Sequence, residues 1–239
     1  MKRYIQLAYI TSFFMALANG TSAQKLALSP YGLAYINTIT LYRESLRNHP
    51  EKQMVSLDNI PGILFDLRYA GQNNFMHRNL YPENTRTTFL RKQVYQALDS
   101  VRMELEKKGI TLVIFDAYRP YSVTIELWKN VRDERYAANP AKGSGHNRGI
   151  SVDLTLADAK THHLLPMPTG FDNFSDSAYQ NFDRVDAKRI ANRALLKRMM
   201  EKHGFISLFS EWWHYSWPET GEYEVLNLSF EQLSKEQGK

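Results

Sequence analysis

Cysteine is absent from the 239-residue sequence, and so are internal repeats and low-complexity tracts. The lack of cysteine excludes disulfide bonds, thiolate chemistry and a lipidated cysteine anchor, so the fold must rest on its core and on any bound metal. Hydrophobic residues make up 43% of the chain, which is enough for a full core in one domain. The net charge of +5 is a modest excess that a solvated surface explains, and it requires no nucleic-acid partner.

Long apolar runs are also lacking, except at the N-terminus. The basic pair Lys2-Arg3 precedes an apolar stretch at 4–18, and small residues follow at 19–23. This order predicts a signal peptide over residues 1–23, and hence an exported, periplasmic protein with no stable membrane insertion after cleavage. The alternative is an uncleaved N-terminal anchor, although the run is shorter than the ~20 residues that a spanning helix needs.

The remaining residues, 24–239, are predicted to form a single domain whose first part, 24–53, is a helical extension. Ser29-Pro30 looks like an N-cap followed by a proline in the first turn of a helix. Elsewhere, apolar residues recur every three or four positions in helical segments and alternate with polar ones in strands. The predicted helices are 29–47, 87–108, 121–136 and 186–203, and the predicted strands lie within 54–70, at 111–115, at 150–156 and within 211–217.

The strand predicted at 150–156 carries the first candidate site residue. Its even-numbered residues are apolar and face one way, whereas Ser151, Asp153 and Thr155 face the other. A buried carboxylate without a partner is costly, so a metal or another cation should lie near Asp153.

Two histidines can join Asp153 in a metal site. His146 lies in the Gly-rich loop before this strand, and His214 lies in the aromatic segment EWWHY at 211–215. Two imidazoles and one carboxylate are the three-ligand set with which a catalytic zinc keeps a fourth position open for water. Glu211, three residues before His214, is a natural base for that water. These residues favour a metallohydrolase with one Zn²⁺ per chain.

Each of these residues has a more ordinary interpretation when it is taken alone. His146 could be an exposed loop histidine, Asp153 an ion-pair partner and His214 a histidine stacked in an aromatic core. Their joint occurrence with Glu211 favours the metal site, although the spacing does not force it. On a regular strand Glu211 and His214 would point to opposite faces, so they can share a site only if the chain turns or bulges near Trp212.

Three further polar residues are candidates for the site. Arg119 follows the strand at 111–115 and can stabilise the oxyanion that develops when a carbonyl is attacked, but it can equally cap a carbonyl or pair with Asp116. Ser144 and Tyr69 could fix the ends of a substrate, and could also be ordinary turn and edge residues.

Five segments, taken in order, resemble the D-alanyl-D-alanine dipeptidases, the VanX-type zinc D,D-dipeptidases. The resemblance implies an α+β fold in which a small central antiparallel sheet is flanked by helices, with the zinc site at one face of the sheet. The ordered set is more specific than any single motif. The segments are DLRYAGQNNF at 66–75, FDAYRP at 115–120, SGHNRGISVDLTL at 144–156, LPMPTGFDNF at 165–174 and EWWHY at 211–215.

The resemblance also implies roles for the candidate residues. His146, Asp153 and His214 match the zinc ligands. Glu211 matches the general base, and Arg119 matches the arginine that stabilises the tetrahedral intermediate.

Three substrate-binding residues are implied as well. Ser144 helps to bind the substrate carboxylate, and Tyr69 and Asp172 hold the dipeptide, with Asp172 near its amino end. The implied activity is hydrolysis of D-Ala-D-Ala to two D-alanines by metal-activated water, in cell-wall peptide turnover or salvage. The partner is thus a small D,D-dipeptide.

Two other functions stay open. One is a zinc D,D-carboxypeptidase that trims the terminal D-Ala from peptidoglycan stem peptides. The other is a non-catalytic zinc-binding wall module. Glu211 and Arg119 argue against such a module, because binding alone needs neither a base nor an oxyanion donor.

Overall fold

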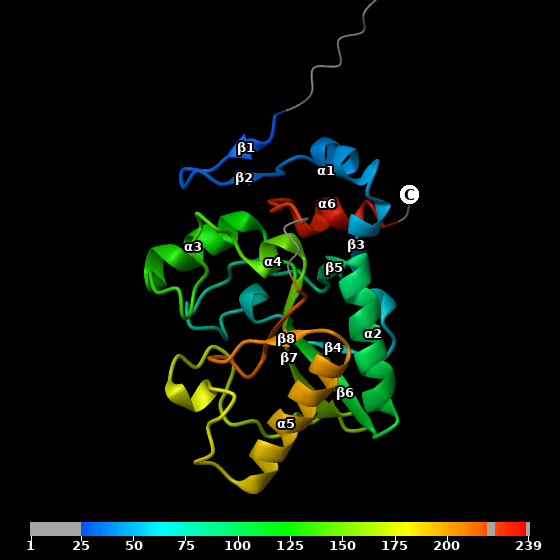
Figure 1. Cartoon of the computed structure of the whole chain (residues 1–239), viewed down its shortest axis with the longest axis vertical. Coiled ribbons are helices and arrows are strands. Elements are labelled where there is room, and N and C mark those ends of the chain that lie inside the picture. Colours follow the sequence, from blue (N-terminus) through cyan, green and yellow to red (C-terminus); the bar gives the residue numbers. More distant parts are fainter. Residues whose placement is uncertain (1–24, 219–222, 238–239) are drawn as a thin grey trace, which may run out of the picture.

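A computed structural model describes residues 25–218 and 223–237 of the chain (Figure 1). The predicted signal peptide, residues 1–23, lies outside the described residues. Within the described part, no helix combines the length and the apolar character needed to cross a membrane.

The centre of the molecule is a five-stranded sheet with the order β4-β6-β7-β9-β8. All neighbouring pairs are antiparallel except β4 with β6, which is parallel. The prediction of an α+β fold with a small central sheet is confirmed, with one parallel pair at its edge. The strands are β4 Leu64–Phe65, β6 Ile110–Asp116, β7 Ser151–Asp158, β8 Ile206–Ser207 and β9 His214–Ser216.

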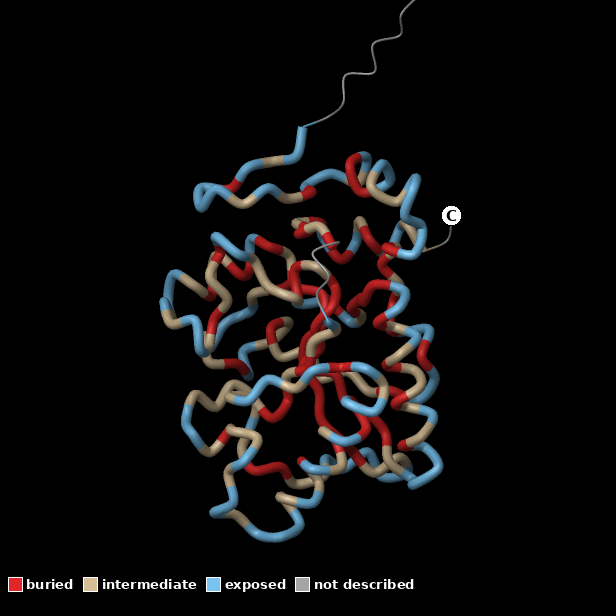
Figure 2. The backbone as a smooth tube through the Cα atoms, in the orientation of Figure 1, coloured by how far each residue is buried: buried red, intermediate tan, exposed pale blue. Residues whose placement is uncertain are grey.

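Two helices, α2 (Lys92–Glu106) and α5 (Ala187–Lys202), cover one face of this sheet and contact each other. Their apolar sides join the even-numbered residues of β7 in one buried cluster. The strands at the centre of the molecule are mostly red in Figure 2, because they are buried. The alternation of β7 therefore places Asp153 on the opposite face. That face is free to carry a polar site.

A second buried cluster joins both ends of the described chain, at the top of Figure 1. Ile36 lies beside Leu226 in an isolated parallel bridge, and the hydroxyl of Tyr42 accepts a 2.7 Å hydrogen bond from the backbone of Met54. The elements here are β1 Ala27–Leu28, β2 Ala34–Tyr35, α1 Ile39–Leu46, β3 Met54–Ser56, β5 Phe89–Arg91, α3 Tyr121–Val131 and α6 Phe230–Ser234. Short 3₁₀ turns, distributed over the described chain, lie at Pro50–Lys52, Leu57–Asn59, Arg68–Ala70 and Asp176–Ala178.

The predicted helix over 29–47 is wrong in its first ten residues. Ser29 does not cap a helix; its hydroxyl accepts backbone hydrogen bonds from Tyr31 and Leu33 within the turn that joins β1 and β2. The helix instead begins at Ile39, where the Thr38 hydroxyl accepts from the backbone of Leu41. A local capping signal cannot distinguish a serine that begins a helix from one that closes a turn.

Two other helices are shorter than predicted. The helix predicted at 87–108 begins only at Lys92, because residues 89–91 pair with β3 as a strand. The helix predicted at 121–136 ends at Val131, where Arg132 takes a left-handed conformation with φ of 48°. The helix at 186–203 and the strands at 111–115 and 150–156 are confirmed to within two residues.

Candidate active site

A cavity of about 210 Å³ lies at the face of the sheet that carries Asp153. The eight residues that the sequence predicts for the site all line it, although they come from segments spread over more than 140 positions. They are Tyr69, Arg119, Ser144, His146, Asp153, Asp172, Glu211 and His214.

Asp153 and His214 face each other across neighbouring strands. Asp153 in β7 pairs in register with His214, the first residue of β9, and their Oδ1 and Nδ1 atoms lie 2.8 Å apart. The Nε2 atom of His214 lies 3.0 Å from the Ser216 hydroxyl, which in turn lies 2.7 Å from the hydroxyl of Ser151. Because Nε2 of His214 makes this contact, Nδ1 is the ring nitrogen that faces Asp153.

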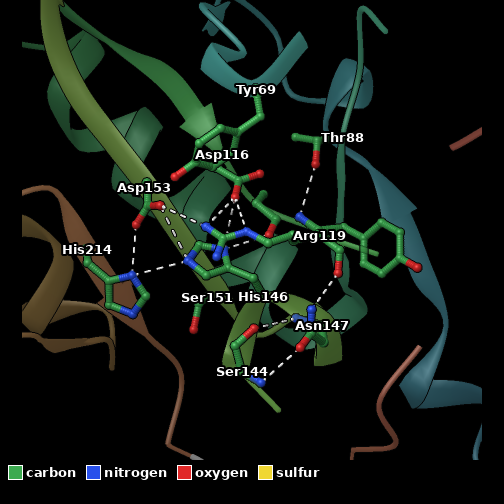
Figure 3. A network of polar contacts seen from close by, with 12 residues as sticks. Tyr69, Thr88, Asp116, Arg119, Ser144, His146, Asn147, Ser151, Asp153 and His214 are labelled. Carbon is green, nitrogen blue, oxygen red and sulfur yellow. Dashed lines mark hydrogen bonds and ion pairs between the residues drawn. The ribbon is translucent and has the colours of Figure 1, made fainter. Parts of the chain in front are cut away.

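His146 enters the cavity from a short helix, α4 (Gly145–Arg148). Its Nδ1 lies 2.7 Å from the carbonyl oxygen of Ala117 and therefore carries the hydrogen. Its Nε2 consequently presents a lone pair to the cavity, 3.2 Å from His214 Nδ1 and 3.4 Å from Asp153 Oδ2. Figure 3 shows the three side chains converging from α4, β7 and β9.

These three residues fit a metal ion. Donor atoms bound tetrahedrally to zinc lie about 3.3 Å from one another. Here the two imidazole nitrogens lie 3.2 Å apart, and the Asp153 carboxylate lies 2.8 Å from His214 through Oδ1 and 3.4 Å from His146 through Oδ2. The Asp153 carboxylate is only 3% exposed, and although burial acts to raise its pKa, the imidazoles of His146 and His214 hold that pKa below its ordinary value. Among the described residues this is the one group of at least three His, Asp or Glu side chains that could hold a metal.

Glu211 reaches the same cavity because the chain turns before β9, as the sequence requires. Residues 212 and 213 form the turn, and the backbone N–H of His214 donates to the carbonyl of Glu211 at 3.3 Å. Burial raises the pKa of Glu211 to about 7, and repulsion from Asp153 adds to the effect while His214 opposes it. A carboxyl group with a pKa near neutrality can both accept and return a proton.

Arg119 pairs with Asp116 and also lines the cavity, so its position is compatible with both roles that the sequence leaves open. Its Nε donates to Asp116 Oδ2 at 2.9 Å, so the ion pair with Asp116 exists. Its terminal nitrogen also lies 3.8 Å from Asp153 Oδ2, and the guanidinium lines the cavity. The guanidinium carbon lies 5.2 Å from the centre of the Tyr69 ring, which supports it from one side.

Tyr69 and Asp172 form a second polar pair in the cavity. The Tyr69 hydroxyl donates to the Asp172 carboxylate at 3.2 Å. Burial, followed by repulsion from Asp153, raises the pKa of Asp172 well above its ordinary range. Asp172 also has a φ of 58°, a left-handed conformation that is uncommon outside glycine, asparagine and aspartate.

Ser144 has a structural role that the sequence suggested only as an alternative. Its hydroxyl accepts from the backbone of Asn147 at 3.1 Å, and the Asn147 side chain accepts from the backbone of Ser144, so the two form a capping box on α4. Ser144 thus orients His146 while it also lines the cavity.

Several cavity residues were missed by the sequence analysis. Residues 134–138 form one wall, and Leu208 and Trp213 contribute apolar surface. Residues 134–138 match no sequence motif, and the sequence indicated Trp213 only as part of the aromatic environment of His214. A larger groove of about 680 Å³ lies between residues 80–87, the start of α3 and α6, and none of the eight predicted site residues lines it.

Two imidazoles and a carboxylate beside a half-buried glutamate and a buried arginine define the site of a metallopeptidase. The comparisons agree: the Peptidase_M15 model, described as D-ala-D-ala dipeptidase, matches residues 50–234. The chain therefore belongs to the D-ala-D-ala dipeptidase family.

Named relatives support this assignment. The chain is 32% identical over 170 residues to a D-alanyl-D-alanine dipeptidase of Escherichia coli, which covers 71% of this chain and 86% of the relative. It is 29% identical over 178 residues to the enzyme of the same name from Streptomyces coelicolor, covering 67% and 88%. The corresponding enzyme of Enterococcus faecalis is 28% identical over 172 residues, covering 64% and 85%.

The donor set predicts about one zinc ion per chain in the purified protein. His214→Ala removes one of three ligands and should lose both the metal and the activity. The matched control is His203→Ala, because His203 contacts Glu104 at the end of α5 and belongs to no metal group. Metal content measured by mass spectrometry of the undenatured protein checks this expectation. A His214→Ala protein that holds as much zinc as the control would contradict the ligand assignment.

Proposed function

We propose that the protein is a zinc-dependent D-alanyl-D-alanine dipeptidase that hydrolyses D-Ala-D-Ala to two D-alanines. The observation that carries the proposal is the convergence of His146, Asp153 and His214 with Glu211 and Arg119 in one small cavity. The family assignment supports the substrate class, because the named relatives are all D-alanyl-D-alanine dipeptidases.

The chemistry divides between the metal and the side chains. Zinc, held by His146, Asp153 and His214, would supply Lewis acidity. Glu211 takes a proton from the attacking water and returns it to the amine that leaves. Arg119 donates to the negative charge that develops on the carbonyl oxygen, and it does so from a fixed position because Asp116 and Tyr69 already hold it.

The charges of the cavity favour a substrate with a free amino group. Asp153, Asp172 and Glu211 are three carboxyl groups in a cavity of about 210 Å³, and their mutual repulsion raises the pKa values of Asp172 and Glu211 after the effect of burial. A zinc ion offsets the charge at Asp153. A substrate ammonium group beside Asp172 would offset the remaining negative charge. A dipeptide supplies such a group, whereas an acylated stem peptide does not.

Glu211→Gln tests the proposed base. Glutamine keeps the shape of the side chain but cannot take the proton, so kcat for D-Ala-D-Ala should fall by at least about 100-fold while zinc content stays unchanged. Glu134→Gln is the matched control, because Glu134 lines the same cavity but both of its oxygens bind Asn139 and Lys142. Steady-state kinetics of the zinc-loaded variants gives the comparison. Near-parent turnover by Glu211→Gln would remove Glu211 from the mechanism.

A substrate series separates the dipeptidase from a D,D-carboxypeptidase. We expect D-Ala-D-Ala to be cleaved with a kcat/KM at least about 100-fold above that of N-acetyl-D-Ala-D-Ala, because the acetyl group removes the positive charge that would face the Asp172 carboxylate. L-Ala-L-Ala should be a poor substrate. Asp172→Asn, which the left-handed backbone tolerates, should reduce the difference in kcat/KM between the free and the acetylated peptide. Equal cleavage of both peptides by the parent protein would instead favour the carboxypeptidase.

The proposed place of action is the periplasm, in turnover or salvage of cell-wall peptides. The support is the sequence of residues 1–23, which has the order of a signal peptide. N-terminal sequencing of the protein recovered from a periplasmic extract should begin at Gln24. A chain that keeps its first 23 residues and stays with the membrane would favour the uncleaved anchor.

A further inference from the structure

Tyr81 is a buried tyrosine that the proposed mechanism does not use. Its side chain is almost completely enclosed, and its hydroxyl donates a 2.7 Å hydrogen bond to Oδ1 of Asp116. The other oxygen of Asp116, Oδ2, accepts from Arg119 Nε at 2.9 Å and lies 2.8 Å from a terminal nitrogen of Arg119. The Asp116 carboxylate thus joins Tyr81 to Arg119, and Figure 3 shows it against the guanidinium.

A second contact connects the same residues from the other side. The Tyr81 ring packs edge-on against the ring of Tyr69, with centroids 5.8 Å apart and an interplanar angle of 80°. The Tyr69 ring in turn lies under the Arg119 guanidinium at 5.2 Å. Tyr81, Asp116, Arg119 and Tyr69 therefore form a closed ring of four side chains, in which each contacts the next.

This ring limits how the Arg119 guanidinium can move. An arginine side chain has several rotatable bonds, and holding it in one geometry costs conformational entropy. Asp116 can fix the guanidinium only if its own carboxylate does not rotate. The Tyr81 hydroxyl prevents that rotation, because a turned carboxylate would lose a buried hydrogen bond to a charged group.

The backbone around Tyr81 is held independently of its hydroxyl. The N–H groups of Leu80 and Tyr81 both donate to the carbonyl of Tyr69, at 2.8 and 2.9 Å. The side-chain amide of Asn74 donates to the carbonyls of Arg68, Gly71 and Arg78, which closes the preceding loop. Removing the hydroxyl alone should consequently leave this segment folded.

We propose that Tyr81 is a positioning residue for the reaction: its hydroxyl fixes the Asp116 carboxylate, which fixes the Arg119 guanidinium where charge develops on the substrate. The proposal rests on the function proposed above for Arg119. Tyr81 does not line the catalytic cavity, and its hydroxyl donates to Asp116, so the effect of the hydroxyl on the reaction must pass through the Asp116 carboxylate.

Tyr81→Phe tests the proposal in the zinc-loaded, full-length protein. We expect kcat for D-Ala-D-Ala to fall roughly tenfold, as for the loss of one hydrogen bond to a charged group, with KM changed less than about twofold. Zinc content should equal that of the parent. Tyr42→Phe is the matched control, because it also removes the hydroxyl of a buried tyrosine, one that binds the backbone of Met54 away from the cavity. The Tyr42→Phe variant should keep the kcat of the parent, although it should lose about as much thermal stability as Tyr81→Phe.

A double variant separates positioning from an independent effect. Arg119→Ala should lower kcat by about 100-fold or more, and adding Tyr81→Phe to it should lower kcat no further, because the hydroxyl acts only through Arg119. Parent-like kcat in Tyr81→Phe, or an additional tenfold loss in the double variant, would overturn the proposal. An equal loss of kcat in Tyr42→Phe would also overturn it, since the effect would then reflect stability.

A measurement that does not depend on turnover distinguishes a failure of the positioning proposal from a failure of the proposed function. The Arg119 Nε–H signal in a ¹⁵N spectrum, identified by its loss in Arg119→Lys, should exchange slowly with water in the parent and faster in Tyr81→Phe. An unchanged exchange rate would overturn the positioning role, whatever substrate the protein cleaves. Faster exchange in a protein that cleaves no D,D-peptide would contradict only the proposed function.

Discussion

The pairing of β7 with β9 is the constraint on which the site depends. Its register sets Asp153 opposite His214, so two of the three candidate ligands are placed by backbone hydrogen bonds before any metal binds. The third, His146, follows because the four residues of α4 end only three positions before β7 begins. A one-residue slip of β9 would turn His214 to the other face of the sheet, toward the helices α2 and α5. Such a slip would also expose the apolar partners of β9 in the core on that face. The cost of this exposure stabilises the register of β9 and therefore the geometry of the site.

The second organising feature is an excess of carboxyl groups around the cavity. Asp116 and Asp153 are buried and Asp172 and Glu211 are half-buried, and removal from water acts to raise the pKa of all four. The buried cation among them is Arg119, which contacts Asp116 and lies near Asp153. Such a cluster is costly unless further positive charge arrives. The proposed divalent metal at Asp153 and the proposed substrate ammonium group at Asp172 would supply that positive charge, so the same electrostatics would favour both binding and catalysis.

The sequence predicted which residues meet in the cavity more accurately than it predicted the elements around it. His146, Asp153, His214 and Glu211 were found because metal chemistry requires few residue types, and the need for a turn before His214 followed from strand geometry alone. The N-terminal hairpin, strand β5 and the parallel pairing of β4 were missed. They depend on partners far along the chain, such as the bridge from Ile36 to Leu226, which no local pattern records. Tyr81 was missed for the same reason: its proposed role follows only from its contact with Asp116, 35 positions away.

The most direct test of the central claim is an anomalous difference map, measured at the zinc edge on crystals of the zinc-loaded protein. The account predicts one strong peak per chain, at about 2.0–2.2 Å from His146 Nε2, an Asp153 carboxylate oxygen and His214 Nδ1. Glu211 and Arg119 should face the metal at this peak without coordinating it. A peak coordinated by other residues, or a metal that takes Glu211 as a ligand in place of Asp153, would contradict the account.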